Sequence, residues 1–214
     1  MGAAVAFNLA AITVVLALAG LALAYALDGA SRQQRVPSAG EPESSVVRTI
    51  AGKELRIPRS LLRYDEQEVA GFATEIDLRL DLPLGADDAI RSIDITLIPR
   101  SKARPSSMLL DGVYLHQFTL QELAGPPGLI GKPLRSGDGF EGETVWYDAL
   151  SADPFVAKCL APLPGAAAGR CVRTVFFEAV AAVYAFDADV LANWRLFDPK
   201  VEAVLGGIGI RRIR

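Results

Sequence analysis

Two segments alternate strictly between apolar and polar side chains. In TEIDLRLDLP the apolar side chains occupy every second position, at Ile76, Leu78, Leu80 and Leu82. SIDITLIP repeats the pattern at Ile93, Ile95 and Leu97. A period of two indicates a strand with one face toward a core and the other toward water. Because only the short segment LGADDA separates them, we predict two neighbouring antiparallel strands.

Further strands are indicated by branched and aromatic side chains between turn residues. VVRTIAGKELRIP (46–58) predicts a hairpin, and RSLLRYDEQE (59–68) a short helical turn. MLLDGVYLHQFTL (108–120) is predicted as a strand, because Gly112 inside a helix would cost about 1 kcal/mol. GPPGLIGKPLRSGDGFEGE (125–143) reads as mostly loop. The remaining strands are predicted in TVWYDAL (144–150), FVAKCL (155–160), CVRTVFFE (171–178) and AVAAVYAF (179–186).

The C-terminal part changes to a helical period. Apolar side chains recur at Val190, Leu191, Trp194 and Phe197. Asp187 or Asp189 is the predicted cap. Pro199 is expected to start a second helix, which Gly206 and Gly207 end. The predicted fold is α+β, a mostly antiparallel sheet with a C-terminal helix packed on it.

Residues 3–27 carry no charge. As a helix this segment would be ~37 Å long, enough to cross ~30 Å of hydrocarbon. We therefore predict a transmembrane anchor at 3–27. A cleaved signal peptide is the alternative, with ALA and AYA near its end as possible cleavage sites. Residues 28–45, rich in Ser, Gly, Pro and charge, are predicted to be a flexible linker. Residues 46–214 are the right length for one globular domain.

Cys159 and Cys171 are the only cysteines. They end one predicted strand and begin the next, so a disulfide would close the loop between them. Two separately buried, reduced thiols are the alternative. A zinc site needs four ligands, and the single histidine is far away in sequence. A disulfide favours an oxidising compartment such as the bacterial periplasm.

Charge modifies this picture only slightly. The chain has net charge −3 and no basic stripe, so we expect no nucleic-acid partner. Arg32 and Arg35 follow the predicted anchor, and flanking cations prefer the cytoplasmic side. The predicted location is nonetheless a single-pass inner-membrane protein with its domain in the periplasm; a cytoplasmic domain is the alternative.

No set of residues indicates catalysis. His116 is the only histidine, and no serine lies in a G-x-S-x-G motif. No phosphate-binding loop occurs, because Pro133 follows Lys132. We predict no catalytic, metal or cofactor-binding residues. The predicted partners are the lipid bilayer, through 3–27, and a protein in the membrane or periplasm. Candidate contact residues are the turn-forming ones at Gly125, Pro126, Gly128, Gly131, Gly137 and Gly139.

Several segments resemble a group of uncharacterised single-span proteins of the bacterial envelope. They are LRIPRSLLR (55–63), GPPGLIG (125–131), GDGFEGE (137–143), PFVAKC (154–159) and LANWRLFD (191–198). The resemblance implies an inner-membrane location and no known activity. The predicted function is a non-enzymatic accessory or interaction subunit of an envelope complex. One alternative is a small-ligand or lipid-binding pocket lined by Trp194, Phe197, Phe176 or Tyr184. The other is a hydrolase that uses His116.

Overall fold

The computed structural model describes residues 44–84, 89–137, 139–162, 165 and 168–212. All of the described residues belong to one compact unit, Glu43–Arg214. The predicted anchor at 3–27 and most of the predicted linker lie outside the described residues, and the last linker residue, Ser45, begins the first strand. In the part that the structure describes, no helix combines the length and apolarity needed to cross a membrane.

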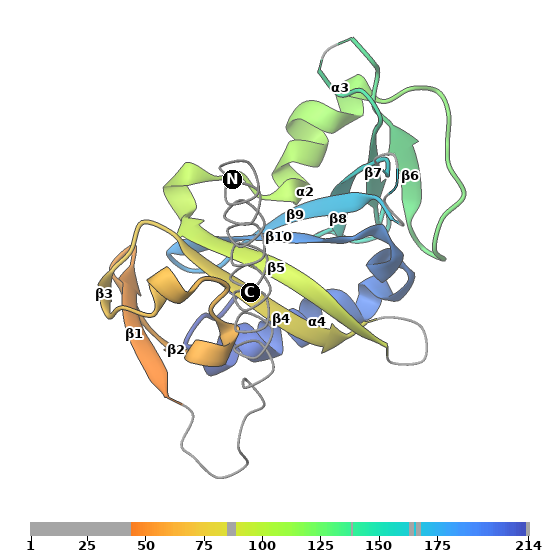
Figure 1. The fold of residues 1–214 in the computed structure, drawn as a ribbon. Helices are drawn as coiled ribbons and strands as arrows, with labels where there is room; N and C mark the ends of the chain where they lie inside the picture. Colours follow the sequence, from red (N-terminus) through yellow and green to blue (C-terminus); the bar gives the residue numbers. More distant parts are fainter. Residues whose placement is uncertain (1–43, 85–88, 138, 163–164, 166–167, 213–214) are drawn as a thin grey trace, which may run out of the picture. The chain divides into compact units, whose positions relative to one another are not determined.

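A seven-stranded sheet in the order β4-β5-β10-β9-β8-β7-β6 forms the centre of the fold (Figure 1). Every neighbouring pair in it is antiparallel. The predicted pairing of β4 with β5 is confirmed, since Leu78 lies opposite Ile95 and Leu80 opposite Ile93. The strands are β4 (Ile76–Pro83), β5 (Ile90–Pro99), β6 (Ile130–Pro133), β7 (Glu143–Tyr147), β8 (Val156–Leu160), β9 (Arg170–Phe176) and β10 (Val180–Asp187).

A small second sheet lies at the β4 end of the domain (Figure 1). Its strands are β1 (Ser45–Ile50), β2 (Lys53–Pro58) and β3 (Gly71–Phe72), in the order β2-β1-β3. The predicted hairpin is confirmed as β1–β2, with Ala51 and Gly52 at positive φ in its turn. The predicted helical turn is two short 3₁₀ helices, η1 (Arg59–Leu61) and η2 (Asp65–Gln67).

The C-terminal helix α4 (Trp194–Gly207) packs against one face of the large sheet, as predicted (Figure 1). It follows the 3₁₀ segment η6 (Ala188–Asn193). Phe197 is fully buried, and its ring centroid lies 4.7 Å from that of Phe186 and 5.5 Å from that of Tyr184. This layer of aromatic and aliphatic side chains is the main core.

Two details of the predicted C-terminal helices are wrong. Pro199 lies inside α4 and does not start a new helix. Proline lacks the N–H that would bond one turn back, but tertiary contacts of the same turn hold the helix: Phe197 fills the core and Asp198 pairs with Arg173. No side-chain cap bond is made at Asp187. Asp187 pairs instead with Arg170, and Asp189 with Arg91.

The strand predicted at 108–120 is also wrong, because the segment is helical. It comprises α2 (Ser106–Leu109), the π-helical η5 (Leu110–Tyr114) and α3 (Leu115–Gln117). Leu110 and Tyr114 are four residues apart, so a helix brings both into the cluster of apolar side chains that includes Val145 and Val156 of the sheet. Gly112 is exposed on this helix, and packing outweighed its unfavourable propensity.

The segment 125–143 is less irregular than predicted. Ile130–Pro133 forms the edge strand β6, paired with β7. Gly131 lies opposite Trp146, and a Cβ at Gly131 would come within 2.5 Å of that indole ring. The glycine therefore allows the strand to lie directly against the tryptophan.

Candidate interaction site

The predicted disulfide is present at the join of β8 and β9. Cys159 and Cys171 face each other in the ladder, their Cα atoms are 3.9 Å apart, and both are buried in the main core. The bond closes the loop between the two strands. It therefore fixes one end of the β8–β9 pair.

Toward its other end this strand pair comes apart. The ladder includes Lys158 opposite Val172, but no pair beyond it. The same register would place Val156 opposite Thr174, yet the backbone N–H of Thr174 donates to Ser106 Oγ (2.8 Å). The carbonyl of Val156 accepts from Arg173 Nη1 (3.1 Å). Two side chains thus replace the missing ladder bonds, which explains why Ser106 and Arg173 are buried polar residues.

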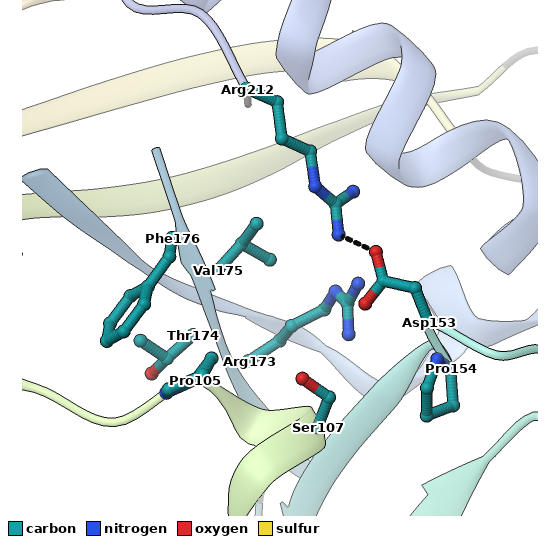
Figure 2. Close-up of a pocket in the computed structure, with 9 residues that line it drawn as sticks. All are labelled: Pro105, Ser107, Asp153, Pro154, Arg173, Thr174, Val175, Phe176 and Arg212. Carbon is teal, nitrogen blue, oxygen red and sulfur yellow. Dashed lines mark hydrogen bonds and ion pairs between the residues drawn. The ribbon is translucent and has the colours of Figure 1, made fainter. Parts of the chain in front are cut away.

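A cavity of about 180 Å³ lies where the strands separate (Figure 2). We call it the β8–β9 slot. Its walls come from the start of α2, the turn before β8, the exposed end of β9 and the C-terminal segment. The lining residues are Pro105, Ser107, Asp153, Pro154, Arg173, Thr174, Val175, Phe176 and Arg212. The guanidinium groups of Arg173 and Arg212, the Asp153 carboxylate and the Ser107 hydroxyl point toward the same space (Figure 2).

Arg173 enters the slot from the core face of β9. Its Nε and Nη2 bond the two oxygens of Asp198 in α4, at 3.1 and 2.6 Å. The side chain of Arg173 is only 3% exposed, and it lies over the ring of Phe155. A buried charge needs a partner with matched geometry, and this two-point pair supplies it. Arg173 thereby joins the helix to the sheet at the wall of the slot.

Arg212 reaches the slot because the chain reverses after α4. Gly209 has φ +98°, and the N–H of Ile210 bonds the carbonyl of Leu205 (2.9 Å). Burial of Ile208 and Ile210 then anchors the C-terminal segment.

The guanidinium of Arg212 bonds two carboxylates, Glu202 Oε1 at 2.9 Å and Asp153 Oδ2 at 2.5 Å. Burial lowers the pKa of Arg212, but the hydrogen bond that Arg212 donates to Glu202 and the charges of Asp153, Asp198 and Glu202 outweigh it and raise the pKa overall. Arg212 is therefore a permanent cation. Its partner Asp153 is the most solvent-exposed member of the network, at 64%.

Several cations lie next to slot residues in the structure or in the sequence. The slot network itself contains two arginines and three carboxylates. Arg100 lies over the ring of Phe176. Lys102 and Arg104 precede the slot residue Pro105, and Arg211 adjoins Arg212. No ion pair joins these last three cations to a carboxylate among the described residues.

A half-buried ion pair lies close to the helical segment 106–117. Lys158 Nζ bonds Glu143 Oε1 at 2.6 Å. Burial, and then the charge of Glu143, raise the pKa of Tyr114. The other oxygen of Glu143 is buried and has no hydrogen-bond partner in the described part of the chain. The pair links the neighbouring strands β7 and β8.

The predicted glycine contacts divide into two kinds. Gly125 and Gly131 leave room for the ring of Trp146, and Gly128 leaves room for Arg195 and Trp194. Trp194 Nε1 and Arg195 Nη1 both donate to the carbonyl of Pro127. This part of the segment lies against Trp146 and the start of α4, while Gly125, Pro127 and Gly128 stay exposed. Gly137 and Gly139 have positive φ and open space around them, so they are turn positions at the surface.

The other predicted candidates do not form a site together. Tyr184 and Phe197 fill the core, and Trp194 packs against it, so of the four aromatic candidates only Phe176 lines the slot. His116 is exposed on α3. Among the described residues no acid or nucleophile is hydrogen-bonded to its imidazole. Nor do the described residues include a group of three or more His, Cys, Asp or Glu side chains placed to hold a metal.

Sequence reasoning missed the slot because its residues come from four distant segments. Arg173 was the one available signal. It occupies a core-facing position in the alternation of CVRTVFFE, between Cys171 and Val175. A charge at such a position requires a buried partner. The sequence gives no sign that Asp198 is this partner, because its position next to Pro199 predicts only the start of a helix.

Comparison with known proteins found a distant similarity to a solved structure but no match to a protein family or a curated protein. The sequence matches no protein-family model, and no curated protein matches it. Among solved structures, the chain is similar to an immunity protein of the Stenotrophomonas maltophilia type IV secretion system. The two share 15% sequence identity with a TM-score of 0.44, over 77% of this chain and 92% of the other. The role of that protein is a property of that protein alone.

Proposed function

We propose that this chain is a membrane-tethered, non-enzymatic recognition subunit of a bacterial envelope complex, with its globular part in the periplasm. The observation that carries the proposal is the β8–β9 slot, where an opened strand pair meets converging charged and hydroxyl side chains. These groups form hydrogen bonds and ion pairs with a partner. His116 belongs to α3 and is not among the residues that line the slot.

The dimensions of the slot favour a protein partner over a lipid or small ligand. Small-molecule sites generally enclose about 300–1,000 Å³ and are mainly apolar. The slot has a volume of about 180 Å³ and is lined by two arginines, an aspartate and two hydroxyl side chains. It can hold one side chain of a larger partner.

Two features support the location. The uncharged segment 3–27 is long enough to span a bilayer as a helix. The Cys159–Cys171 disulfide lies in the core of the domain, and such bonds persist in oxidising compartments.

The partner is tested by tagging the full chain in its own host and solubilising the membranes in a mild detergent. The proposal predicts recovery from the membrane fraction with one protein in stoichiometric amount. Recovery of the chain alone, with or without bound lipid, would contradict it.

The compartment is tested separately by acid-quenching whole cells and denaturing them in the presence of a maleimide. The proposal predicts that Cys159 and Cys171 are alkylated only after reduction. Alkylation of both cysteines without a reductant would place the domain in the cytoplasm.

A further inference from the structure

The chemistry of the slot points to a specific kind of partner segment. We infer that the β8–β9 slot binds an acidic side chain carried by an extended segment of the partner, with the carboxylate on Arg212 and the backbone along the open edge of β9. This inference rests on the proposed function, because it names the part of the partner that the recognition site takes.

The open edge of β9 provides the backbone contacts. β8 pairs with β9 only as far as Val172, whereas β10 stays paired with β9 as far as Phe176. On the edge that β8 leaves open, the Thr174 N–H is bonded to Ser106 Oγ. Phe177 donates its N–H to Val180 in β10, so the N–H and C=O of its neighbour Phe176 point away from β10, toward the slot side. In the described part of the chain, the Phe176 N–H donates no hydrogen bond. An extended segment entering there would continue the sheet where β8 leaves it.

The side-chain contact is already occupied by an internal carboxylate. Asp153 Oδ2 lies 2.5 Å from Arg212 Nη2, yet the Asp153 side chain is 64% exposed. It belongs to the short turn between β7 and β8 and is joined to Arg212 by a single bond. A carboxylate from a partner can therefore take its place on Arg212 without disturbing Glu202, which bonds the other nitrogen, Nη1.

Charge favours an anionic partner over a neutral one. Arg100 lies over the ring of the slot residue Phe176, and Arg104 and Arg211 directly precede the slot residues Pro105 and Arg212. Cations around a site speed the encounter with an acidic segment and weaken it at high salt. A lipid phosphate would satisfy these cations but would leave the Phe176 N–H without a partner. A peptide satisfies both, so an acidic peptide segment is the occupant that the structure favours.

The test uses the full chain in detergent micelles and blocked hexapeptides of alternating threonine and valine with one central glutamate. The matched control peptides carry glutamine in place of glutamate. Binding is followed by NMR at the Phe176 amide and the Arg212 Nε–H. The inference predicts that only the glutamate peptides shift both signals. It also predicts that added salt weakens the binding of these peptides.

Two variants make the inference falsifiable. Asp153→Asn removes the competing charge, so it should tighten glutamate-peptide binding by roughly 3- to 10-fold. Arg212→Gln removes the guanidinium that would bind the peptide carboxylate and should weaken binding by about 10-fold or more. The matched control pair, Asp189→Asn and Arg91→Gln, alters an ion pair that does not line the slot and should change neither. If the Arg212→Gln variant does not fold, the inference is decided by whether Asp153→Asn binds the glutamate peptides more tightly than the wild-type chain does.

Three results would overturn the inference. One is equal binding of the glutamate and glutamine peptides, or no binding of either peptide. Another is an unchanged affinity in Asp153→Asn. The third is a shift of the slot signals by phosphatidylcholine vesicles containing phosphatidylglycerol, with no effect of the peptides, which would assign the slot to lipid. If a stoichiometric partner co-purifies equally well with Arg212→Gln, the recognition role stands and only the slot assignment fails.

Discussion

Arg173 and Asp198 join the sheet to the C-terminal helix by two parallel hydrogen bonds across the domain core. The same arginine uses a third nitrogen to bond the carbonyl of Val156. One side chain therefore fixes α4, replaces one missing bond of the β8–β9 ladder and forms a wall of the slot. Arg173 therefore contributes both to the stability of the domain and to the proposed recognition site.

Removing one member of this pair should be costly. Asp198→Asn leaves the Arg173 charge buried with no counter-ion, and we expect a loss of about 3–5 kcal/mol in the free energy of unfolding. The control is Asp189→Asn, which breaks the exposed pair with Arg91 and should cost less than about 1 kcal/mol. Urea unfolding of the full chain measures both. Equal losses would show that burial does not set the importance of the pair.

The disulfide should contribute to stability through the loop that it closes. Replacing Cys159 and Cys171 together by alanine should cost about 3 kcal/mol, because the two are 12 residues apart. Adding a reductant should destabilise the wild-type chain by a similar amount and leave the double variant unchanged. A reductant effect on the double variant would mean that the bond is not its target.

Gly131 should not tolerate a methyl group. Gly131→Ala places a Cβ within 2.5 Å of the Trp146 ring and should destabilise the domain by about 1–3 kcal/mol. Gly112→Ala is the matched control, because nothing lies within 4 Å of its added Cβ, and in a helix it should stabilise by about 0.5–1 kcal/mol. Thermal melts of both variants test this. Effects of the same sign would contradict the packing explanation.

Stability should fall in alkali. Burial is the main cause that raises the pKa of Tyr184, followed by the charge of Asp198. The folded chain therefore keeps this phenol proton after the unfolded chain loses it. The contribution of Tyr184 is present below the unfolded pKa of about 10, and it declines by up to about 1.4 kcal/mol per pH unit above it.

Tyr184→Phe should flatten this decline, because phenylalanine does not titrate. The measurement is the urea midpoint of both chains between neutral pH and pH values above that of free tyrosine. Parallel profiles for the two chains would show that Tyr184 is not responsible.

Local periodicity predicts most of the strands. In β4 and β5 the alternation is strict, and a short connection leaves one pairing, so both elements and their partnership follow from the sequence. The disulfide is predictable for the same reason, since its cysteines flank one loop. In these cases sequence neighbours decide the structure.

Elements whose stability comes from distant residues were not predictable. The helical segment around Gly112 forms because Leu110 and Tyr114 reach Val145 and Val156 of the sheet. Pro199 stays within α4 because contacts made by Phe197 and Asp198 hold its turn. The slot was not predictable for the same reason, because it forms where β8 and β9 separate and its lining residues come from distant segments.

The central claim is that the β8–β9 slot contacts a partner protein. The most direct test is photocrosslinking in living cells of the native host, with Ser107 replaced by p-benzoylphenylalanine. The account predicts a crosslink to one protein, weakened by Arg212→Gln, and none from the same replacement at the exposed residue Asp81 on β4, which β5 and β10 separate from β9. No crosslink at position 107, or equal crosslinks at both positions, would contradict the account.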